Sequence, residues 1–158
     1  MKIIEGDWYI EQESRFRGYF AHVNTKADFE NFLSQIKQIH ETAHHHVWAY
    51  RIEAPQLNML GDREIMEKSS NDGEPSNTGR TVLEILSKKR FVNGRNIEFA
   101  NCAVVIVRYF GGILLGAENV PKAFGRTTLV LLDKVIALML KHNCRCIKAR
   151  GQHMSLIE

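Results

Sequence analysis

Apolar residues alternate or recur at helical spacing along most of the chain, and these patterns predict its secondary structure. Residues 8–13 and 15–23 are aromatic and β-branched, with alternation in the second stretch, so we predict a hairpin that turns near Glu13 and Ser14. Residues 24–28 supply an N-cap and an early acid, and apolar residues then recur at helical spacing to about His40. This part of the chain therefore predicts two strands and an amphipathic helix.

The middle of the chain predicts a strand, a long loop and a second helix. Residues 46–54 alternate and predict a strand that Pro55 ends. Residues 56–78 form the longest irregular stretch, and loops of that length in a compact domain are usually functional or disordered. Residues 79–89 then predict a helix whose basic last turn suits the negative end of its dipole.

The last predicted strand and helix are the most apolar elements. Residues 102–107 read CAVVIV, which is typical of a strand covered on both faces. A helix runs from Pro121 to about Lys141 and is apolar over a wide arc, which implies deep burial or a partner on its second face. The order ββαβαβα predicts an α/β (α+β) two-layer sandwich, in which helices cover one sheet.

The composition fits one globular domain. The chain has 158 residues, of which 44% are hydrophobic and 25% charged, and we expect a single domain over residues 1–158 with its core at about 8–141. No apolar run reaches the roughly 18 to 20 residues of a membrane span. The acidic start lacks the features of a secretory signal. We therefore expect a cytoplasmic protein without membrane association.

Cysteine and histidine spacing argues against a metal site. Cys102, Cys144 and Cys146 are too few for a disulfide framework, which agrees with a reducing compartment. Zinc sites more often use C-x-x-C pairs or histidines at helical spacing than a C-x-C pair or the consecutive histidines 44–46. We expect no metal and no cofactor.

Charge is divided unevenly along the chain. Residues 1–78 carry 8 basic and 13 acidic side chains, a net charge of −5, whereas residues 79–158 carry 13 basic and 5 acidic side chains, a net charge of +8. A basic half indicates a surface for phosphates or an acidic partner, and a solvated basic helix face gives the same count.

Four motifs occur in order over residues 10–132. NDGEPSNTGRTVLEIL, which begins at Asn71, resembles the DDGEP-x-GTAG-x-P-x-L-x-x-L segment of the IMPACT/YigZ family. VVIVRYFGGILLGAENVPKAFG, which begins at Val104, resembles the family's VVVRYYGGILLG-x-GGLV-x-AYG segment. Upstream, SRFRGYFAHVNT and AHHHVWAYRI resemble its SRF and HHC-x-AW/AYR patterns.

The resemblance implies a fold and a cellular context. Family members share a fold like the second domain of small-subunit ribosomal protein five and domain IV of elongation factor G. Eukaryotic relatives carry a preceding RWD domain and bind the ribosome-associated activator of the amino-acid-starvation kinase, and bacterial relatives carry a following ferredoxin-like domain. We expect neither extension here, so that the chain is the core domain alone.

The chain departs from the family pattern at two places, one in the segment that begins at Val104 and one in the segment that begins at Asn71. Glu118 and Asn119 replace paired glycines, and NTGR is one residue shorter than GTAGR. Glycines let a backbone close around a phosphate, and an acid beside such a nest repels an anion. A phosphate site, if the family has one, is expected to be weaker in this chain.

The Asp72-Gly73-Glu74 motif places two carboxylates on a predicted loop. Paired carboxylates ligate Mg²⁺ or act as acid and base. The alternative is a turn in which Asp72 accepts hydrogen bonds from the backbone and Glu74 pairs with Arg108 or Arg80.

Arg108 follows the apolar strand and precedes a glycine-rich turn. With Gly111, Gly112 and Gly116 it can hold a phosphate or carboxylate, since ligands gather at the carboxyl ends of strands in open α/β sheets. The alternative is an internal ion pair with Asp72 or Glu74 that fixes the long loop.

The last helix and the two residues after Arg108 add candidate nucleic-acid contacts. Lys122 and Arg126 lie about one turn apart and extend a positive strip. Tyr109 and Phe110 can stack on bases beside that strip, although aromatics next to a buried strand are usually core.

The sequence is compatible with three functions. The first is a non-enzymatic module that contacts the ribosome, RNA or a translation-regulatory protein. The second is a small enzyme or ligand-binding protein for a phosphorylated metabolite at the DGEP loop and the Gly-Gly turn, an analogy at the level of fold. The third is a pure protein-interaction module, with homodimerisation through the last helix.

Overall fold

Antiparallel strands and three helices make up residues 1–141, which are the residues that the computed structural model describes. In chain order the elements are β1 (Ile3–Glu5), β2 (Tyr9–Glu11), β3 (Ser14–His22), α1 (Lys26–Ile39), β4 (His45–Leu57), β5 (Arg63–Ser70), α2 (Thr78–Ser87), β6 (Arg90–Val92), β7 (Arg95–Ile97), β8 (Cys102–Tyr109) and α3 (Asn119–Lys141). Cys144 and Cys146 lie outside the described residues. Within residues 1–141, no helix is both long and apolar enough to cross a membrane.

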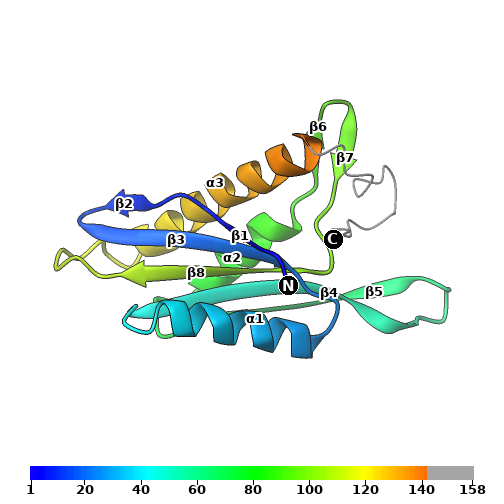
Figure 1. Cartoon of the computed structure of the whole chain (residues 1–158), viewed down its shortest axis with the longest axis horizontal. Helices are drawn as coiled ribbons and strands as arrows, with labels where there is room; N and C mark the ends of the chain where they lie inside the picture. The colour runs from blue at the N-terminus through cyan, green and yellow to red at the C-terminus, as the bar shows by residue number, and fades with distance from the viewer. Residues whose placement is uncertain (142–158) are drawn as a thin grey trace.

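The main sheet is antiparallel and has β8 at its centre. Its strand order is β1-β3-β8-β4-β5, and β2 also pairs with β3 (Figure 1). The register places Arg108 of β8 opposite Phe16 of β3 and His45 of β4. The end of β8 therefore meets the beginnings of β3 and β4 at one end of the sheet.

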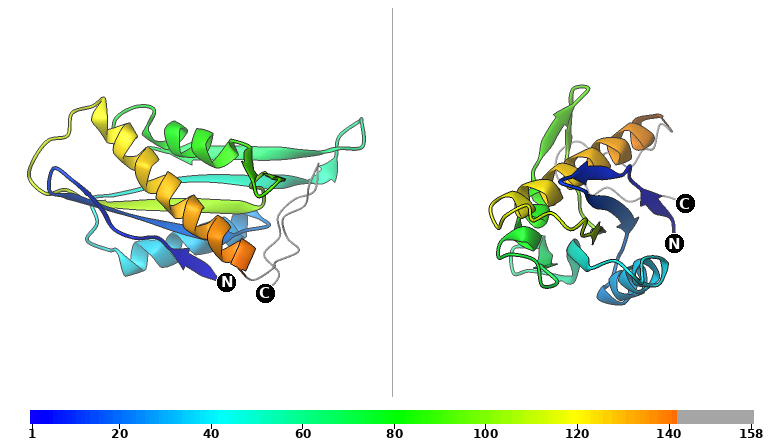
Figure 2. Two further views of the ribbon diagram at one scale, coloured as in Figure 1. Left: turned by 90° about the horizontal axis from the view of Figure 1, so that it is seen from above. Right: turned by 90° about the vertical axis from the view of Figure 1, so that its left-hand side faces the viewer.

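Helices cover both faces of this sheet. On one face, Phe32 of α1 belongs to the same buried cluster as Val105. On the other face, Leu131 of α3 packs in a cluster with Val104 and Ile106, and α2 joins it there (Figure 2). The α+β class is confirmed, and the expected two-layer arrangement is corrected to a sheet between two helical layers. The cause is the alternation along β8, which sends fully buried side chains to both faces.

The first hairpin and helix occur as predicted. β2 and β3 pair across a turn at Gln12 and Glu13, whose φ angles are 48° and 63°. Thr25 caps α1, because its hydroxyl accepts from the Asp28 backbone N–H while the Asp28 carboxylate accepts from the Thr25 N–H.

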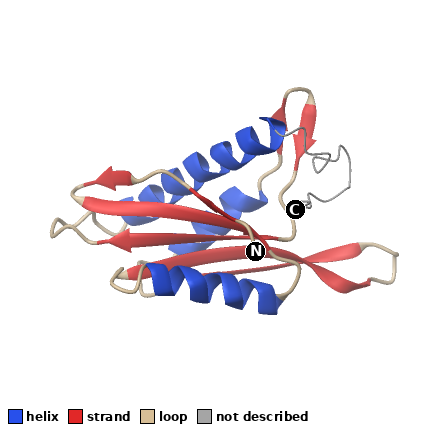
Figure 3. Ribbon diagram, viewed as in Figure 1, coloured by secondary structure: helices blue, strands red, loops and turns tan. Residues whose placement is uncertain are grey.

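The segment 56–78 is not the irregular loop that we expected, because β5 occupies residues 63–70. β4 also continues through Pro55 to Leu57, so the expected end at Pro55 is wrong. Pro55 is tolerated because the β4–β5 register shifts between Glu53 and Leu57. β5 is an edge strand with mostly exposed side chains, so it lacks the alternation that marks a half-buried strand. Figure 3 shows this hairpin projecting beyond the rest of the sheet.

Three short strands also escaped the apolar pattern. β1 pairs with β3 over only three residues. β6 and β7 form a separate hairpin whose turn residues, Asn93 and Gly94, have φ angles of 50° and 75°. Strands this short carry too few residues for a periodic signal.

Most of the apolar arc of α3 is buried in the core. The buried members are at most 6% exposed and comprise Leu131, Leu132, Val135, Ile136 and Met139. Only Leu129 and Val130 are about half exposed, at 44% and 45%. The sequence left open whether the wide apolar arc of this helix is buried or contacts a partner. Packing on the sheet accounts for most of it.

Gly79 is predicted to be required for the contact between α2 and β5. A Cβ atom at this position would lie 2.7 Å from the backbone carbonyl of Ser70. We expect Gly79→Ala to lower the free energy of unfolding by about 1–3 kcal/mol, as overpacking does. The matched control is Arg80→Ala, whose exposed side chain pairs with Glu84, and it should change the stability by at most ~0.5 kcal/mol. Urea unfolding of both variants tests this, and equal stabilities would contradict it.

Candidate functional site

A buried ion pair joins the end of the central strand to the loop between β5 and α2. Nη1 of Arg108 donates to both carboxylate oxygens of Glu74 at 2.9 Å. The side chains are 7% and 3% exposed. Nη2 donates to the Ser14 hydroxyl at 3.3 Å. Of the two alternatives for Arg108, the structure therefore contains the internal ion pair, and Glu74 is the partner.

Aromatic rings surround the guanidinium of Arg108. The guanidinium carbon lies 5.5 Å from the centroid of the Phe16 ring and 5.7 Å from that of Phe110. Its Nε is buried without a hydrogen-bond partner among the described residues. Low polarity strengthens the attraction to Glu74, and it also makes an unpaired charge costly here.

Two histidines hold the DGE turn against the start of β4. The Asp72 carboxylate accepts from the backbone N–H of His46 at 2.7 Å, and the Asp72 carbonyl lies 2.7 Å from His45 Nδ1. His45 Nε2 lies 3.4 Å from Glu74 Oε1. Because a carbonyl only accepts, His45 Nδ1 carries the proton. Asp72 and Gly73 both have positive φ angles, of 43° and 82°. At position 73, glycine adopts this conformation without strain.

A pocket of about 470 Å³ opens beside the ion pair, and we name it the Arg108 pocket. Its polar lining consists of Glu74, Arg108 and the side chains of His44 and His45. The remaining lining is mainly apolar and comprises Pro75, Phe110, Leu114, Leu115, Gly116, Ala117 and Val120. At its rim, Leu114 is 84% exposed. The pocket thus combines a charge pair that is internally balanced with apolar walls.

The glycines after β8 shape the loop that forms one wall of this pocket. A Cβ atom on Gly111 would lie 2.1 Å from the Glu13 carbonyl oxygen, so only glycine fits. Gly112 and Gly116 have φ angles of 89° and 86°. Asn119 donates from Nδ2 to the Leu115 carbonyl at 3.0 Å and fastens the loop to α3.

The basic candidates on the helices lie outside the pocket. Arg80 is exposed and pairs with Glu84 one turn away on α2. Arg126 of α3 pairs with Glu11 of β2 at 3.0 Å, so its charge is locally matched. Lys122 is exposed on α3. The predicted positive strip is therefore interrupted by the acid opposite Arg126.

Tyr109 lies on the opposite face of the sheet from Arg108, because neighbouring residues of a strand alternate. Its hydroxyl lies 2.7 Å from Nδ1 of His40, and the other ring nitrogen of His40 is hydrogen bonded to the Tyr19 hydroxyl. Arg15 stacks over the Tyr109 ring at 5.1 Å. The structure thus separates Tyr109 from the other candidates, which the sequence alone placed beside it.

Burial sets the protonation of this histidine and tyrosine pair. It lowers the pKa of His40 below the usual 6.5, and His46 and Arg17 lower that pKa further while Glu5 raises it. Burial also raises the pKa of Tyr19 to about 12, with a smaller contribution from Glu5. A neutral imidazole donates to one tyrosine hydroxyl and accepts from the other, which fits both contacts.

Sequence reasoning missed the pocket roles of His45, Phe110 and Leu114. The three consecutive histidines were visible, but the register that places His45 opposite Arg108 was not. Leu114 lies in a loop, where apolar periodicity carries no information. Among residues 1–141 there is no cluster of three or more His, Cys, Asp or Glu side chains able to hold a metal ion.

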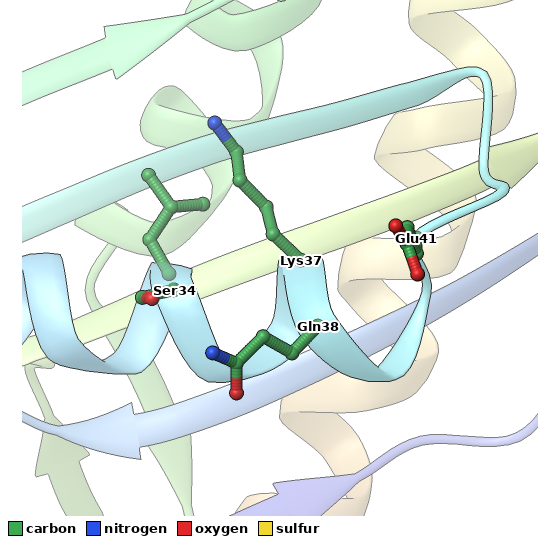
Figure 4. Close-up of a pocket in the computed structure, with 5 residues that line it drawn as sticks. Ser34, Lys37, Gln38 and Glu41 are labelled. Atoms are coloured by element: carbon green, nitrogen blue, oxygen red, sulfur yellow. The ribbon is translucent and has the colours of Figure 1, made fainter.

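A second hollow lies on the outer surface of α1. It measures about 530 Å³ and is lined by Leu33, Ser34, Lys37, Gln38 and Glu41. Figure 4 shows that Lys37 and Gln38 point in different directions from the helix. Its lining comes from α1 and the turn after it, and it includes none of the candidate residues.

Comparisons with known proteins show the family to which the chain is similar. Residues 12–132 match the family model described as the Impact N-terminal domain. The chain is 36% identical over 119 residues to the IMPACT family member YvyE of Bacillus subtilis, covering 75% of this chain and 48% of the relative. It is 34% identical over 141 residues to an IMPACT family member of Haemophilus influenzae, covering 84% of this chain and 61% of the relative. The chain thus spans about half to three fifths of the length of these relatives.

A solved structure shares the fold. A crystal structure of a hypothetical protein superposes with a TM-score of 0.65 at 26% identity, covering 85% of this chain and 62% of that chain. The two-domain translational regulator Yih1 superposes with a TM-score of 0.47 at 20% identity, covering 82% of this chain and 45% of that chain. The second likeness is too low to indicate shared function.

The Arg108–Glu74 pair is predicted to be strongly coupled. Glu74→Ala leaves the buried Arg108 charge unpaired, so we expect it to lower the free energy of unfolding by about 3–5 kcal/mol. The double variant Glu74→Ala/Arg108→Ala should lose less than the sum of the single losses. Asp72→Ala, whose carboxylate is 41% exposed, should cost only about 1 kcal/mol. Urea unfolding measures all four variants, and additive losses would refute the coupling.

His40 is predicted to make stability depend on pH. Its pKa is lower in the folded state than in the unfolded state, so the unfolded chain binds the proton more readily. The stabilisation by neutral His40 is therefore complete above about pH 6.5 and is lost as the pH falls toward the folded-state pKa. We expect the stability difference between the unaltered protein and His40→Gln to be larger at about pH 7.5 than at about pH 5. Denaturant titrations at both pH values test this, and a difference independent of pH would contradict it.

Proposed function

This chain belongs to the IMPACT family, and we propose that it is a non-enzymatic binding module that contacts a protein component of the translation machinery. The resemblance of its motifs to IMPACT/YigZ proteins implies the link to translation. Because the chain spans only part of the length of its relatives, this link and the partner both belong to the proposal.

The balanced interior of the Arg108 pocket is the observation that carries the proposal. The charge of Arg108 is matched by Glu74, so a phosphate entering the pocket meets a carboxylate as well as a guanidinium. The walls formed by Leu114, Leu115 and Val120 instead suit an uncharged, apolar side chain. A partner residue that fills such a pocket is typical of the anchor residues of protein interfaces.

The engagement of the DGE carboxylates supports binding over catalysis. Glu74 accepts from Arg108 through both oxygens, and Asp72 accepts from the His46 backbone. These bonds fix the loop and occupy the groups that an acid–base mechanism would use. Thr78 is likewise engaged, because its hydroxyl donates to the Pro75 carbonyl at 2.6 Å.

Co-sedimentation with purified ribosomes tests this function. We expect the unaltered protein to pellet with ribosomes at salt above about 200 mM, where contacts to phosphates are weak. Leu114→Asp places a charge at the rim of the Arg108 pocket, and it should weaken binding at least about tenfold. The matched control is Met59→Asp, at a fully exposed apolar residue in the turn between β4 and β5. This control should pellet like the unaltered protein.

Two results would contradict the proposed function. One is the absence of pelleting of the unaltered protein at every salt concentration. The other is an equal loss of binding in Leu114→Asp and Met59→Asp, which would indicate non-specific adhesion of apolar surface. Both positions are highly exposed, so circular dichroism and thermal unfolding should show that both variants remain folded.

A further inference from the structure

The hairpin formed by β6 and β7 is basic and carries an exposed aromatic ring. Residues 88–97 read KKRFVNGRNI, with four cationic side chains and no acid. Its two strands pair from Arg90 opposite Ile97 to Val92 opposite Arg95. The hairpin projects from the α2 and α3 side of the domain, away from the main sheet (Figures 1 and 2).

One face of this hairpin is fixed to the body of the domain. Ile97 is 1% exposed, and Val92 packs against the same core cluster as α3. The guanidinium carbon of Arg90 lies 5.8 Å from the centroid of the Phe99 ring, and Asp133 of α3 acts on it electrostatically. These contacts hold the hairpin in place and leave its other face outward.

Three exposed cations, two just before the hairpin and one within it, have no acidic partner among the described residues. Lys88, Lys89 and Arg95 are exposed, and no ion pair within residues 1–141 engages their side chains. Most other exposed arginines of the domain, by contrast, form an ion pair: Arg80 pairs with Glu84, and Arg126 pairs with Glu11. Unpaired cations grouped on and beside one short hairpin indicate a polyanionic ligand.

Phe91 adds a feature that charge alone does not explain. Its side chain is 73% exposed and lies opposite Asn96 in the hairpin, among the cations. Exposing a phenylalanine to water is unfavourable without a partner. An exposed ring beside free cations matches the combination by which proteins bind single-stranded nucleic acid, where bases stack and phosphates are neutralised.

We propose that the β6–β7 hairpin is a binding site for single-stranded nucleic acid. Phe91 stacks on a base, and Lys88, Lys89 and Arg95 contact the adjacent phosphates. Single strands fit better than duplexes, because only unpaired bases offer a face to an aromatic side chain. This site lies outside the Arg108 pocket, so the inference goes beyond the proposed function and either can fail alone.

Fluorescence anisotropy with labelled oligouridylate and oligodeoxythymidylate of about 12 nucleotides tests the site. We expect Phe91→Ala to weaken binding roughly tenfold at constant salt, through the loss of stacking. The double variant Lys88→Glu/Lys89→Glu should weaken binding and make the slope of log affinity against log salt shallower by about 1.4. Its matched control is Lys26→Glu/Lys37→Glu on α1, which changes the net charge equally on the other side of the sheet and should bind normally.

Several outcomes separate this site from general electrostatic attraction. Binding of either oligonucleotide that depends on Phe91 and on the two lysines supports the proposal. Absence of binding at low salt overturns it. Normal binding by Phe91→Ala, or equal losses in the two lysine double variants, also overturns it, because the attraction would then be diffuse charge. None of these outcomes changes the expected pelleting with ribosomes through Leu114.

Discussion

The buried ion pair between Arg108 and Glu74 is the constraint on which the candidate site depends. Arg108 comes at the end of the central strand, where the antiparallel register leaves its side chain between two phenylalanine rings. A guanidinium in such surroundings must be paired, and Glu74 reaches it only if the DGE turn crosses the end of the sheet. The ion pair therefore fixes a loop as well as a charge, and that loop supplies one side of the Arg108 pocket.

This pairing also decides what the pocket can accept. A free arginine among glycines is a phosphate site in many proteins, but here the carboxylate that positions the arginine also cancels its charge. The surrounding loop contributes leucine side chains, and Asn119 holds it to α3. The two proposed binding surfaces thus lie apart: an apolar pocket at one end of the sheet, and unpaired cations with an exposed ring on and beside the β6–β7 hairpin.

The apolar periodicity of the sequence predicted the elements that bury an apolar face. It could not predict contacts between residues that are far apart in the chain. The run at 102–107 and the stripe of α1 were recognisable because burial imposes a repeat on the sequence. β5 was missed because an edge strand keeps few buried side chains, and Pro55 misled because its effect depends on a register shift in the partner strand. The family motifs located Glu74 and Arg108, yet the choice between an anion site and an internal pair required the fold. Tyr109 was grouped with Arg108 by sequence proximity, although strand alternation places it on the other face.

Hydrogen exchange measured by mass spectrometry on the unaltered protein and on Glu74→Gln tests most directly whether the ion pair holds the loop. The substitution keeps the size of the side chain and removes its charge. The account predicts faster exchange of backbone amides in residues 71–79, while α1, on the opposite face of the sheet, exchanges at an unchanged rate. Unchanged exchange in residues 71–79 would contradict the central role of the pair and would mean that the turn is held by its backbone contacts alone.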